Sequence, residues 1–259
     1  MNKNLKVILK IIGIKQTVLA LKSVGRYIDF FKDYKVFKKE FSSANVDMKL
    51  EFADLFPMIH DKTTSTPFDR HYIWHTAWAA RKLKELNPKE HYDISSSLYF
   101  VSIASAFINI KFFDYRPADL NLSNLSTEHA DLVKLSFEDS SIDSLSCMHV
   151  VEHIGLGRYG DPLNVKGDAK AIAELKRVVA PKGDLLFVVP IGQSKIMFNA
   201  HRIYSYQNII DYFDGFELVE FSLIPDSDKG NSIVYNATKE ESDNQEYGCG
   251  LFHFRKISL

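Results

Sequence analysis

The sequence has few cysteines and no long apolar segment. Its two cysteines, Cys147 and Cys249, lie far apart in a chain of 259 residues. Neither a disulfide framework nor a cysteine-based zinc site is therefore expected, and both residues are interpreted as small buried apolar side chains. No uninterrupted apolar run approaches the roughly 20 residues that span a bilayer, and no small-residue cleavage site marks a signal peptide. We therefore expect a globular cytoplasmic protein.

Acidic residues are scarce at the start of the chain. The first 40 residues contain ten Lys/Arg against three Asp/Glu, a net charge of +7, whereas the remainder carries −8. Apolar residues between Leu5 and Phe41 recur at helical spacing, which predicts an amphipathic helix. It either lies on an anionic membrane, at the inner face of the cytoplasmic membrane, or packs on its own domain or a partner. No nucleic-acid-binding motif accompanies the basic residues, so no nucleic-acid partner is expected.

Beyond this extension, helix-like and strand-like segments alternate. The composition, 46% hydrophobic and 25% charged, is that of an ordinary globular domain. We predict a basic helical extension over residues 1–45 and one α/β domain over residues 60–259. Helices are expected at 66–86, 96–106, 166–179 and 205–213, and strands at 90–94, 108–114, 128–133, 144–150, 184–190, 216–224 and 250–257. This alternation predicts a Rossmann-like, mostly parallel sheet of seven strands with helices on both faces.

In such a sheet a ligand binds at the carboxyl ends of the strands, so the residues that follow each strand are informative. After the first strand, Asp93 to Ser97 place small side chains where a backbone can approach a ligand closely. Asp114 ends the second strand, where a carboxylate can accept both hydroxyls of a ribose. Asp131 follows the third strand, and His149 ends the fourth.

Three segments in order resemble the class I S-adenosylmethionine-dependent methyltransferases: residues 130–143, 149–154 and 174–185. The resemblance implies a methyltransferase-like transferase of that fold. More narrowly, His149 to Pro162 is similar to a bacterial family of uncharacterised methyltransferase-like proteins associated with surface-polysaccharide gene clusters. That resemblance extends from about Phe68 to the end of the chain.

The resemblance implies S-adenosyl-L-methionine as cofactor. Asp114 would bind the ribose hydroxyls and Asp131 the adenine amino group. The other implied contacts come from Asp93, Ser95, Ser96, Leu132 and His149. The family's Asp-x-Gly-x-Gly is replaced by Asp93-Ile94-Ser95-Ser96-Ser97, and serine disfavours both close approach and positive φ. Either the pocket admits the cofactor less closely or another ligand has replaced it; the two retained acids favour the first.

A glycine-rich loop follows the fourth strand, with Arg158, Tyr159 and Asp161 in it. Apolar periodicity does not explain these residues, and an arginine in a strand-end loop suits a phosphate or carboxylate. The substrate would then be a sugar, a nucleotide-sugar or a lipid-linked glycan. Alternatively, an Arg158–Asp161 pair only orders the loop.

His149, Glu152 and His153 raise the question of a metal. Their order is His-x-x-Glu-His, the inverse of the zinc-protease motif, and a strand-to-loop setting argues against a regular metal-binding helix. We therefore expect no metal there. Methyl transfer to a hydroxyl requires a base, and Glu152 or His153 is the natural candidate. A hydrogen-bonded structural role is the alternative for each histidine.

His201 and Arg202 follow the fifth strand, where the connection usually borders the acceptor in this fold. Either they contact the substrate, or Ser205 caps the next helix and the basic pair is solvated.

These residues predict methylation of a sugar hydroxyl during synthesis of a bacterial surface polysaccharide. Two rival functions stay open. One is a non-methylating enzyme on the same fold, for example an isomerase of nucleotide-sugars. The other is a non-catalytic member of a glycan-assembly complex, which the basic extension and missing glycines would suit.

Overall fold

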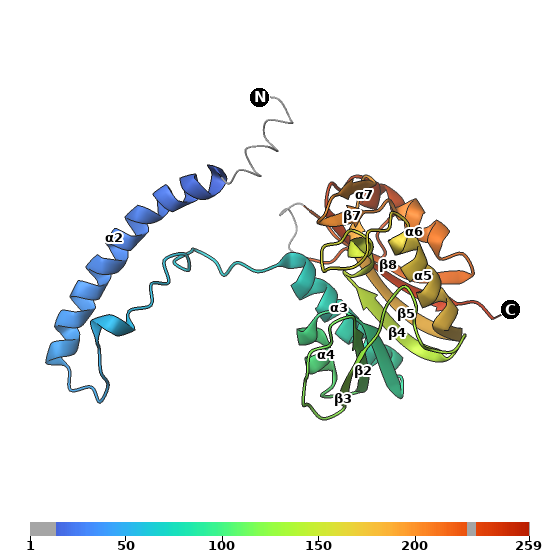
Figure 1. The fold of residues 1–259 in the computed structure, drawn as a ribbon, viewed down its shortest axis with the longest axis horizontal. Helices are drawn as coiled ribbons and strands as arrows, with labels where there is room; N and C mark the ends of the chain where they lie inside the picture. The colour runs from blue at the N-terminus through green and yellow to red at the C-terminus, as the bar shows by residue number, and fades with distance from the viewer. Residues whose placement is uncertain (1–13, 227–231, 259) are drawn as a thin grey trace. The chain divides into compact units, whose positions relative to one another are not determined.

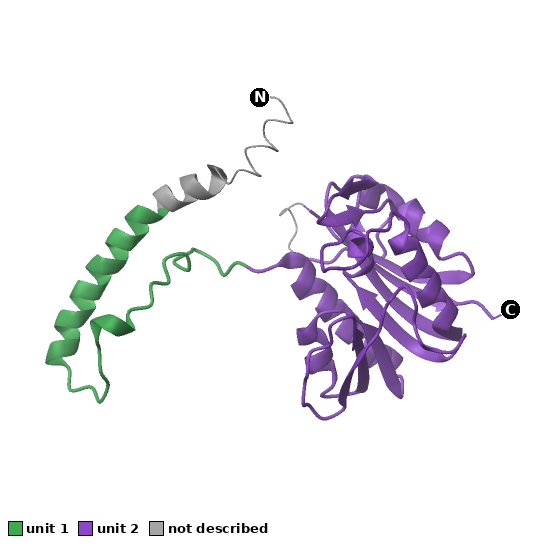
Figure 2. Cartoon of the chain, viewed as in Figure 1, with its two compact units in different colours: residues 1–67 green, residues 68–259 purple. Residues whose placement is uncertain are grey.

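The computed structural model describes residues 14–226 and 232–258. Contacts divide the chain into two compact units, residues 1–67 and 68–259, which Figure 2 shows in green and purple. The first contains α2 (Ile14–Ser43) and a short 3-10 helix (Phe52–Asp54). The helix predicted between Leu5 and Phe41 thus lies partly outside the described residues. No helix in the described ranges is both long and apolar enough to cross a membrane.

The second unit is built on one seven-stranded sheet, with the strand order β3-β2-β1-β4-β5-β9-β8. The five strands from β3 to β5 are parallel, and β9 runs antiparallel between β5 and β8. Their bounds are β1 Glu90–Ile94, β2 Asn109–Asp114, β3 Leu125–His129, β4 Ile142–Met148, β5 Val179–Ile191, β8 Phe216–Ile224 and β9 Gly248–Lys256. The predicted mostly parallel sheet of seven strands is confirmed.

Helices cover both faces of this sheet (Figure 1). On one face, α3 (Arg70–Leu86) and α4 (Leu98–Ala104) bury Trp78 and Phe100 against the strands. On the other, α5 (Gly167–Val178) and α6 (Tyr206–Tyr212) pack on a cluster that includes Phe187 and Phe252. Each buried aromatic side chain removes a large apolar area from water, which stabilises the layered arrangement. A short helix, α7 (Lys239–Asp243), precedes β9.

Polar side chains set the helix ends. Asp69 caps α3 by accepting a hydrogen bond from the Tyr72 amide at 3.1 Å, and the helix ends at Asn87 in a left-handed conformation. This cap places the start of α3 later than the predicted residue 66. Ser205 caps α6 through a reciprocal capping box with Asn208, as the sequence alternative proposed.

Two sequence predictions of strands need correction. The third strand was expected at 128–133 but is Leu125–His129; Asp131 follows it, as the strand-end assignment predicted. β3 is an edge strand with mostly exposed side chains, and hydrophobic alternation therefore does not mark its bounds. A small antiparallel pair, β6 (Lys195–Met197) and β7 (His201–Ile203), also occupies a connection that was expected to have no strand.

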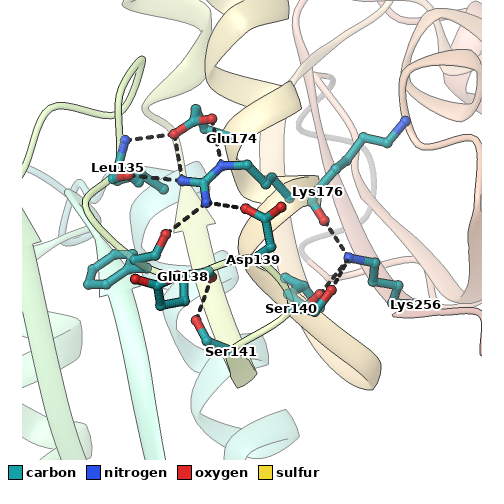
Figure 3. A network of polar contacts seen from close by, with 11 residues as sticks. Leu135, Glu138, Asp139, Ser140, Ser141, Glu174, Lys176 and Lys256 are labelled. Carbon is teal, nitrogen blue, oxygen red and sulfur yellow. Dashed lines mark hydrogen bonds and ion pairs between the residues drawn. The ribbon is translucent and has the colours of Figure 1, made fainter.

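Arg177 of α5 holds the segment that follows β3 through hydrogen bonds to its backbone. Its guanidinium donates to the carbonyl oxygens of Leu135 at 2.9 Å and Phe137 at 2.7 Å. The same group pairs with Glu174 and Asp139, within the network that Figure 3 draws. Glu174 in turn accepts the Leu135 amide at 2.7 Å. This bidentate arrangement orders a turn that has no regular structure of its own.

Candidate active site

A cavity of about 450 Å³ lies at the carboxyl ends of four adjacent parallel strands. Ser95 follows β1, Asp114 ends β2, Asp131 follows β3 and His149 follows β4, and all four side chains line it. We call this space the strand-end cavity. Apolar atoms of Ala130, Leu132 and Ile154 complete its wall. The sequence prediction that these strand-end residues share one site agrees with this placement.

The two carboxylates of the strand-end cavity are held by the backbone. Asp114 Oδ1 accepts the Arg116 amide at 2.7 Å, and Asp131 Oδ1 accepts the Val133 amide at 3.1 Å. Within the described structure the second oxygen of each makes no hydrogen bond. Each side chain is therefore oriented while an acceptor atom stays available to a ligand.

Ser95 occupies the position at which the family pattern has its first glycine. Its φ of +57° lies in the left-handed region, where a non-glycine residue costs roughly 1–2 kcal/mol. The conformation is held because the Ser95 amide donates to the Phe113 carbonyl oxygen at 2.7 Å and the hydroxyl donates to the same oxygen at 3.3 Å. The loop thus keeps the left-handed turn without glycine, and the hydroxyl is tied to the strand.

Asp93 and Ser96 lie beneath this loop, not in the cavity wall. Asp93 is fully buried and accepts the Ser96 amide at 3.0 Å and the Ser146 hydroxyl. The Ser96 hydroxyl accepts the Met148 amide at 3.1 Å, which joins the loop to the end of β4. Burial raises the pKa of Asp93 to about 6, against the opposing effect of its hydrogen bonds. These two predicted cofactor contacts therefore position the loop.

A second cavity, of about 360 Å³, adjoins the first. We call it the histidine cavity because His71, His149, His153 and His201 line it. The two cavities share four lining residues, namely Tyr72, His149, His153 and Tyr159. A ligand in one would therefore lie against side chains that also face the other.

Glu152 is the buried acid of the histidine cavity. Its Oε1 contacts His149 Nδ1 at 2.8 Å, and its Oε2, although buried, has no hydrogen-bond partner in the described structure. Burial raises the pKa of Glu152 to about 7 and lowers that of His149 to about 4. His149 itself has a φ of +58°, and its other nitrogen, Nε2, lies 3.3 Å from Cys249 Sγ.

Asp161 orders the glycine-rich loop without Arg158. Its Oδ2 accepts the Gly155 amide at 2.7 Å, and its Oδ1 accepts the Tyr159 amide at 3.3 Å. Gly155 has a φ of +79°, and a Cβ there would come within 2.1 Å of the Asn164 carbonyl oxygen. The predicted tight loop therefore depends on this glycine. No Arg158–Asp161 ion pair forms among the described residues.

Arg158 instead faces the histidine cavity. Its guanidinium donates to the Ala200 carbonyl oxygen at 3.0 Å and lies 5.0 Å from the centre of the Tyr159 ring. Arg116 lies 5.1 Å from the centre of the same ring. His153 Nδ1 also bonds the Ala200 oxygen, at 2.7 Å. The Tyr159 ring borders both cavities, and the two guanidinium groups that lie over it bring positive charge there.

The two basic residues after β5 have different surroundings. His201 lines the histidine cavity, and its buried Nε2 has no partner in the described structure. Arg202 is buried, donates to the Ile154 carbonyl oxygen at 2.7 Å and pairs with Asp168 at 3.3 Å. For Arg202 the interpretation as a solvated residue was wrong, because its side chain is buried, and it lines neither the strand-end cavity nor the histidine cavity.

Several residues of the histidine cavity were not predicted. His71 and Tyr72 come from the first turn of α3, and Tyr247 precedes β9. The Tyr247 ring stacks on His201 and lies 5.0 Å from the ring of His71. The sequence signal for His71 and Tyr72 was the presence of polar aromatic residues at the start of an amphipathic helix. Their position beside the carboxyl end of β4 depends on tertiary contacts.

Residues 100–251 match the family model described as Caenorhabditis protein of unknown function, DUF268. This match covers more than half of the chain. The chain belongs to the DUF268 family. The description of DUF268 states no activity and no link to bacterial polysaccharides, so that part of the resemblance stays a prediction. Comparison with curated proteins found no match.

Solved structures establish the fold of this DUF268 chain. The N-methyltransferase NodS from Bradyrhizobium japonicum WM9, in complex with S-adenosyl-L-homocysteine, is 15% identical with a TM-score of 0.50, covering 78% of this chain and 92% of NodS. The 1,6-didemethyltoxoflavin-N1-methyltransferase of Burkholderia thailandensis is 9% identical with a TM-score of 0.50, covering 71% and 79%. The DUF268 chain therefore has the class I methyltransferase fold.

Proposed function

We propose that this DUF268 protein binds S-adenosyl-L-methionine in the strand-end cavity and transfers its methyl group to a hydroxyl group in the histidine cavity. The observation that supports this most is the meeting of Ser95, Asp114, Asp131 and His149 around one cavity at four adjacent strand ends. Solved proteins of this fold hold S-adenosylhomocysteine, the demethylated product.

The residues of the strand-end cavity fit that cofactor. Asp114 has an oxygen available for the ribose hydroxyls and Asp131 one for the adenine amino group, while Leu132 offers an apolar surface for the base. The Ser95 hydroxyl is bonded to the backbone of β2, so the loop keeps the turn that glycine normally provides. The cavity of about 450 Å³ is in the size range of cofactor sites.

Glu152 is proposed as the base. S-adenosylmethionine supplies a methyl group on a positively charged sulfur. As the acceptor oxygen forms its bond to carbon and the carbon–sulfur bond breaks, the hydroxyl proton must leave. Glu152 lines the histidine cavity, and its Oε2 is buried without a hydrogen-bond partner in the described structure. This oxygen can therefore accept that proton. His153 would position the acceptor.

As acceptor we propose a sugar of a nucleotide-sugar or lipid-linked glycan, in the synthesis of a bacterial surface polysaccharide. The histidine cavity is lined by imidazole, phenol and carboxyl groups that can hydrogen-bond to several hydroxyls. Arg158 beside Tyr159 would hold a phosphate. The similarity of His149 to Pro162 to polysaccharide-associated proteins supports the same class.

The test combines binding and turnover. Isothermal titration with S-adenosylmethionine and S-adenosylhomocysteine should show binding, and labelled cofactor should methylate candidate sugars. Glu152→Gln is expected to lower turnover by roughly 10²- to 10⁴-fold while cofactor binding is retained, and exposed Glu138→Gln should match the parent. Binding of another nucleotide but neither cofactor form would contradict the proposal. A changed sugar without a methyl group would support the isomerase instead.

We also propose that residues 1–40 attach the chain to an anionic membrane surface. The support is their net charge of +7 together with apolar side chains of α2, Val24, Ile28 and Phe31, that are about half exposed. Lysines would contact the headgroups and the apolar side chains the layer beneath.

A further inference from the structure

Three potential metal ligands meet beside the histidine cavity, and two of them, His71 and His149, line it. One ligand atom each of His71, His149 and Cys249 lies within 4.8 Å of the others. His149 Nε2 and Cys249 Sγ are 3.3 Å apart, and the rings of His71 and His149 have centres 5.4 Å apart. The residues come from α3, the end of β4 and β9, so three separate elements direct them to one point.

The surroundings of His149 support metal binding. Its Nδ1 is held by Glu152 Oε1 at 2.8 Å, which leaves Nε2 directed at Cys249. A carboxylate on the far nitrogen of an imidazole is the usual support of a metal-binding histidine, because it fixes the ring and its tautomer. The left-handed backbone of His149, with φ at +58°, is a strained conformation that such sites often hold.

A further buried nitrogen lies beside the cluster. His75 is fully buried, and its ring packs edge-on against His149 with centres 5.1 Å apart. Its Nδ1 bonds the His71 carbonyl oxygen at 2.7 Å, but its Nε2 has no partner in the described structure. Burying a polar group without a hydrogen-bond partner costs free energy. Core packing therefore gives no reason for several imidazoles to surround one thiol.

We propose that His71, His149 and Cys249 bind a divalent transition-metal ion, zinc by preference. Two imidazoles and a thiolate are ligands that zinc selects, and three protein ligands leave a fourth position open. Because His71 and His149 line the histidine cavity, the open position faces that cavity. Binding displaces the thiol proton of Cys249 to solvent, so the metal–sulfur bond forms to a thiolate.

The role of the ion rests on the proposed methyl transfer. An acceptor hydroxyl at the open position would be polarised by the cation, which eases loss of its proton. The sequence pattern of residues 149–153 predicts no metal, because the other proposed ligands lie far from this segment along the chain. Two of the proposed ligands, His149 and Cys249, are 100 positions apart.

Cobalt substitution of the full chain tests the site. Co²⁺ added to the metal-free protein should give one equivalent bound and the absorption band of a cobalt–thiolate bond. Cys249→Ser should remove the band and His71→Gln should weaken metal binding, whereas Cys147→Ser, the other buried cysteine, should keep the parent's spectrum. Glu152→Gln should weaken zinc binding by roughly 10- to 100-fold. Absence of the band in the parent, or its persistence in Cys249→Ser, would overturn the proposal.

A second measurement keeps the test independent of folding and of methyl transfer. Zinc should raise the melting temperature of the parent chain but not that of Cys249→Ser, whose own melting transition shows that it folds, and equal shifts in both would overturn the site. Titration with S-adenosylmethionine is run on the same samples. A cobalt–thiolate band without cofactor binding would refute the proposed function alone, and cofactor binding without the band would refute the metal site alone.

Discussion

His91 provides a sharp test of the buried network beneath the cofactor loop. The imidazole is fully buried and bonds Ser144 and Ser146 of β4, each at 2.8 Å, and Ser146 continues to Asp93. Burial lowers the pKa of His91 from 6.5 to about 3. The folded chain thus holds this ring neutral over a range of pH in which the unfolded chain binds a proton.

The sign and size of the effect follow from linkage. Because the folded pKa is depressed, the free energy of unfolding contributed by His91 is present above pH 6.5 and is lost as the pH falls toward 3. Between pH 7 and pH 5 the loss is about 2 kcal/mol, since one pKa unit is worth about 1.4 kcal/mol. Glutamine keeps a donor and an acceptor for the two serines but does not titrate. The stability difference between parent and His91→Gln should change by that amount over this interval.

Urea denaturation at several pH values measures the difference. Ser144→Ala is the matched control, because it removes one partner of the ring but leaves the imidazole buried. It should lower stability by about 1–3 kcal/mol at every pH and retain the parent's pH dependence. If His91→Gln keeps that dependence, or if Ser144→Ala abolishes it, burial of His91 is not its cause.

The other predictions concern ligand binding, loop strain and attachment. Asp114→Asn and Asp131→Asn should each weaken S-adenosylmethionine binding roughly 10- to 100-fold by titration, as loss of a charged hydrogen bond requires, whereas exposed Asp143→Asn should not. Ser95→Gly should bind the cofactor at least as well as the parent, while Ser95→Val should cost roughly 1–3 kcal/mol of stability in thermal melts; equal stability of both would argue against strain there. Deletion of residues 1–40 should abolish flotation with anionic liposomes, and equal flotation of both forms would refute membrane attachment.

The strand-end residues could be predicted because local pattern determines them. Asp114 and His149 stand at the ends of short apolar segments, and parallel strands place such ends at one edge of a sheet. The serine loop after β1 could be located in the same way. Its left-handed turn at Ser95 could not, because a hydrogen bond to the neighbouring strand holds that conformation.

Arg202 and Asp93 show that residue type and position next to a strand end do not establish whether a side chain contacts a ligand. Both were judged by their place next to strand ends, yet each is buried, and its hydrogen bonds hold the site in shape. Whether a charged side chain at such a position faces a ligand or supports a loop depends on which segments pack over it. That packing involves residues far along the chain and leaves no periodic signal.

The class of fold and the set of strand ends at which chemistry is expected follow from the amino-acid pattern, because alternation of apolar segments and turn residues is a local property. The side chains that face those strand ends from other elements depend on tertiary packing. The antiparallel insertion of β9 between β5 and β8 brings Cys249 to His149, and the start of α3 brings His71 to the same place. Contacts across such separations depend on how whole elements pack.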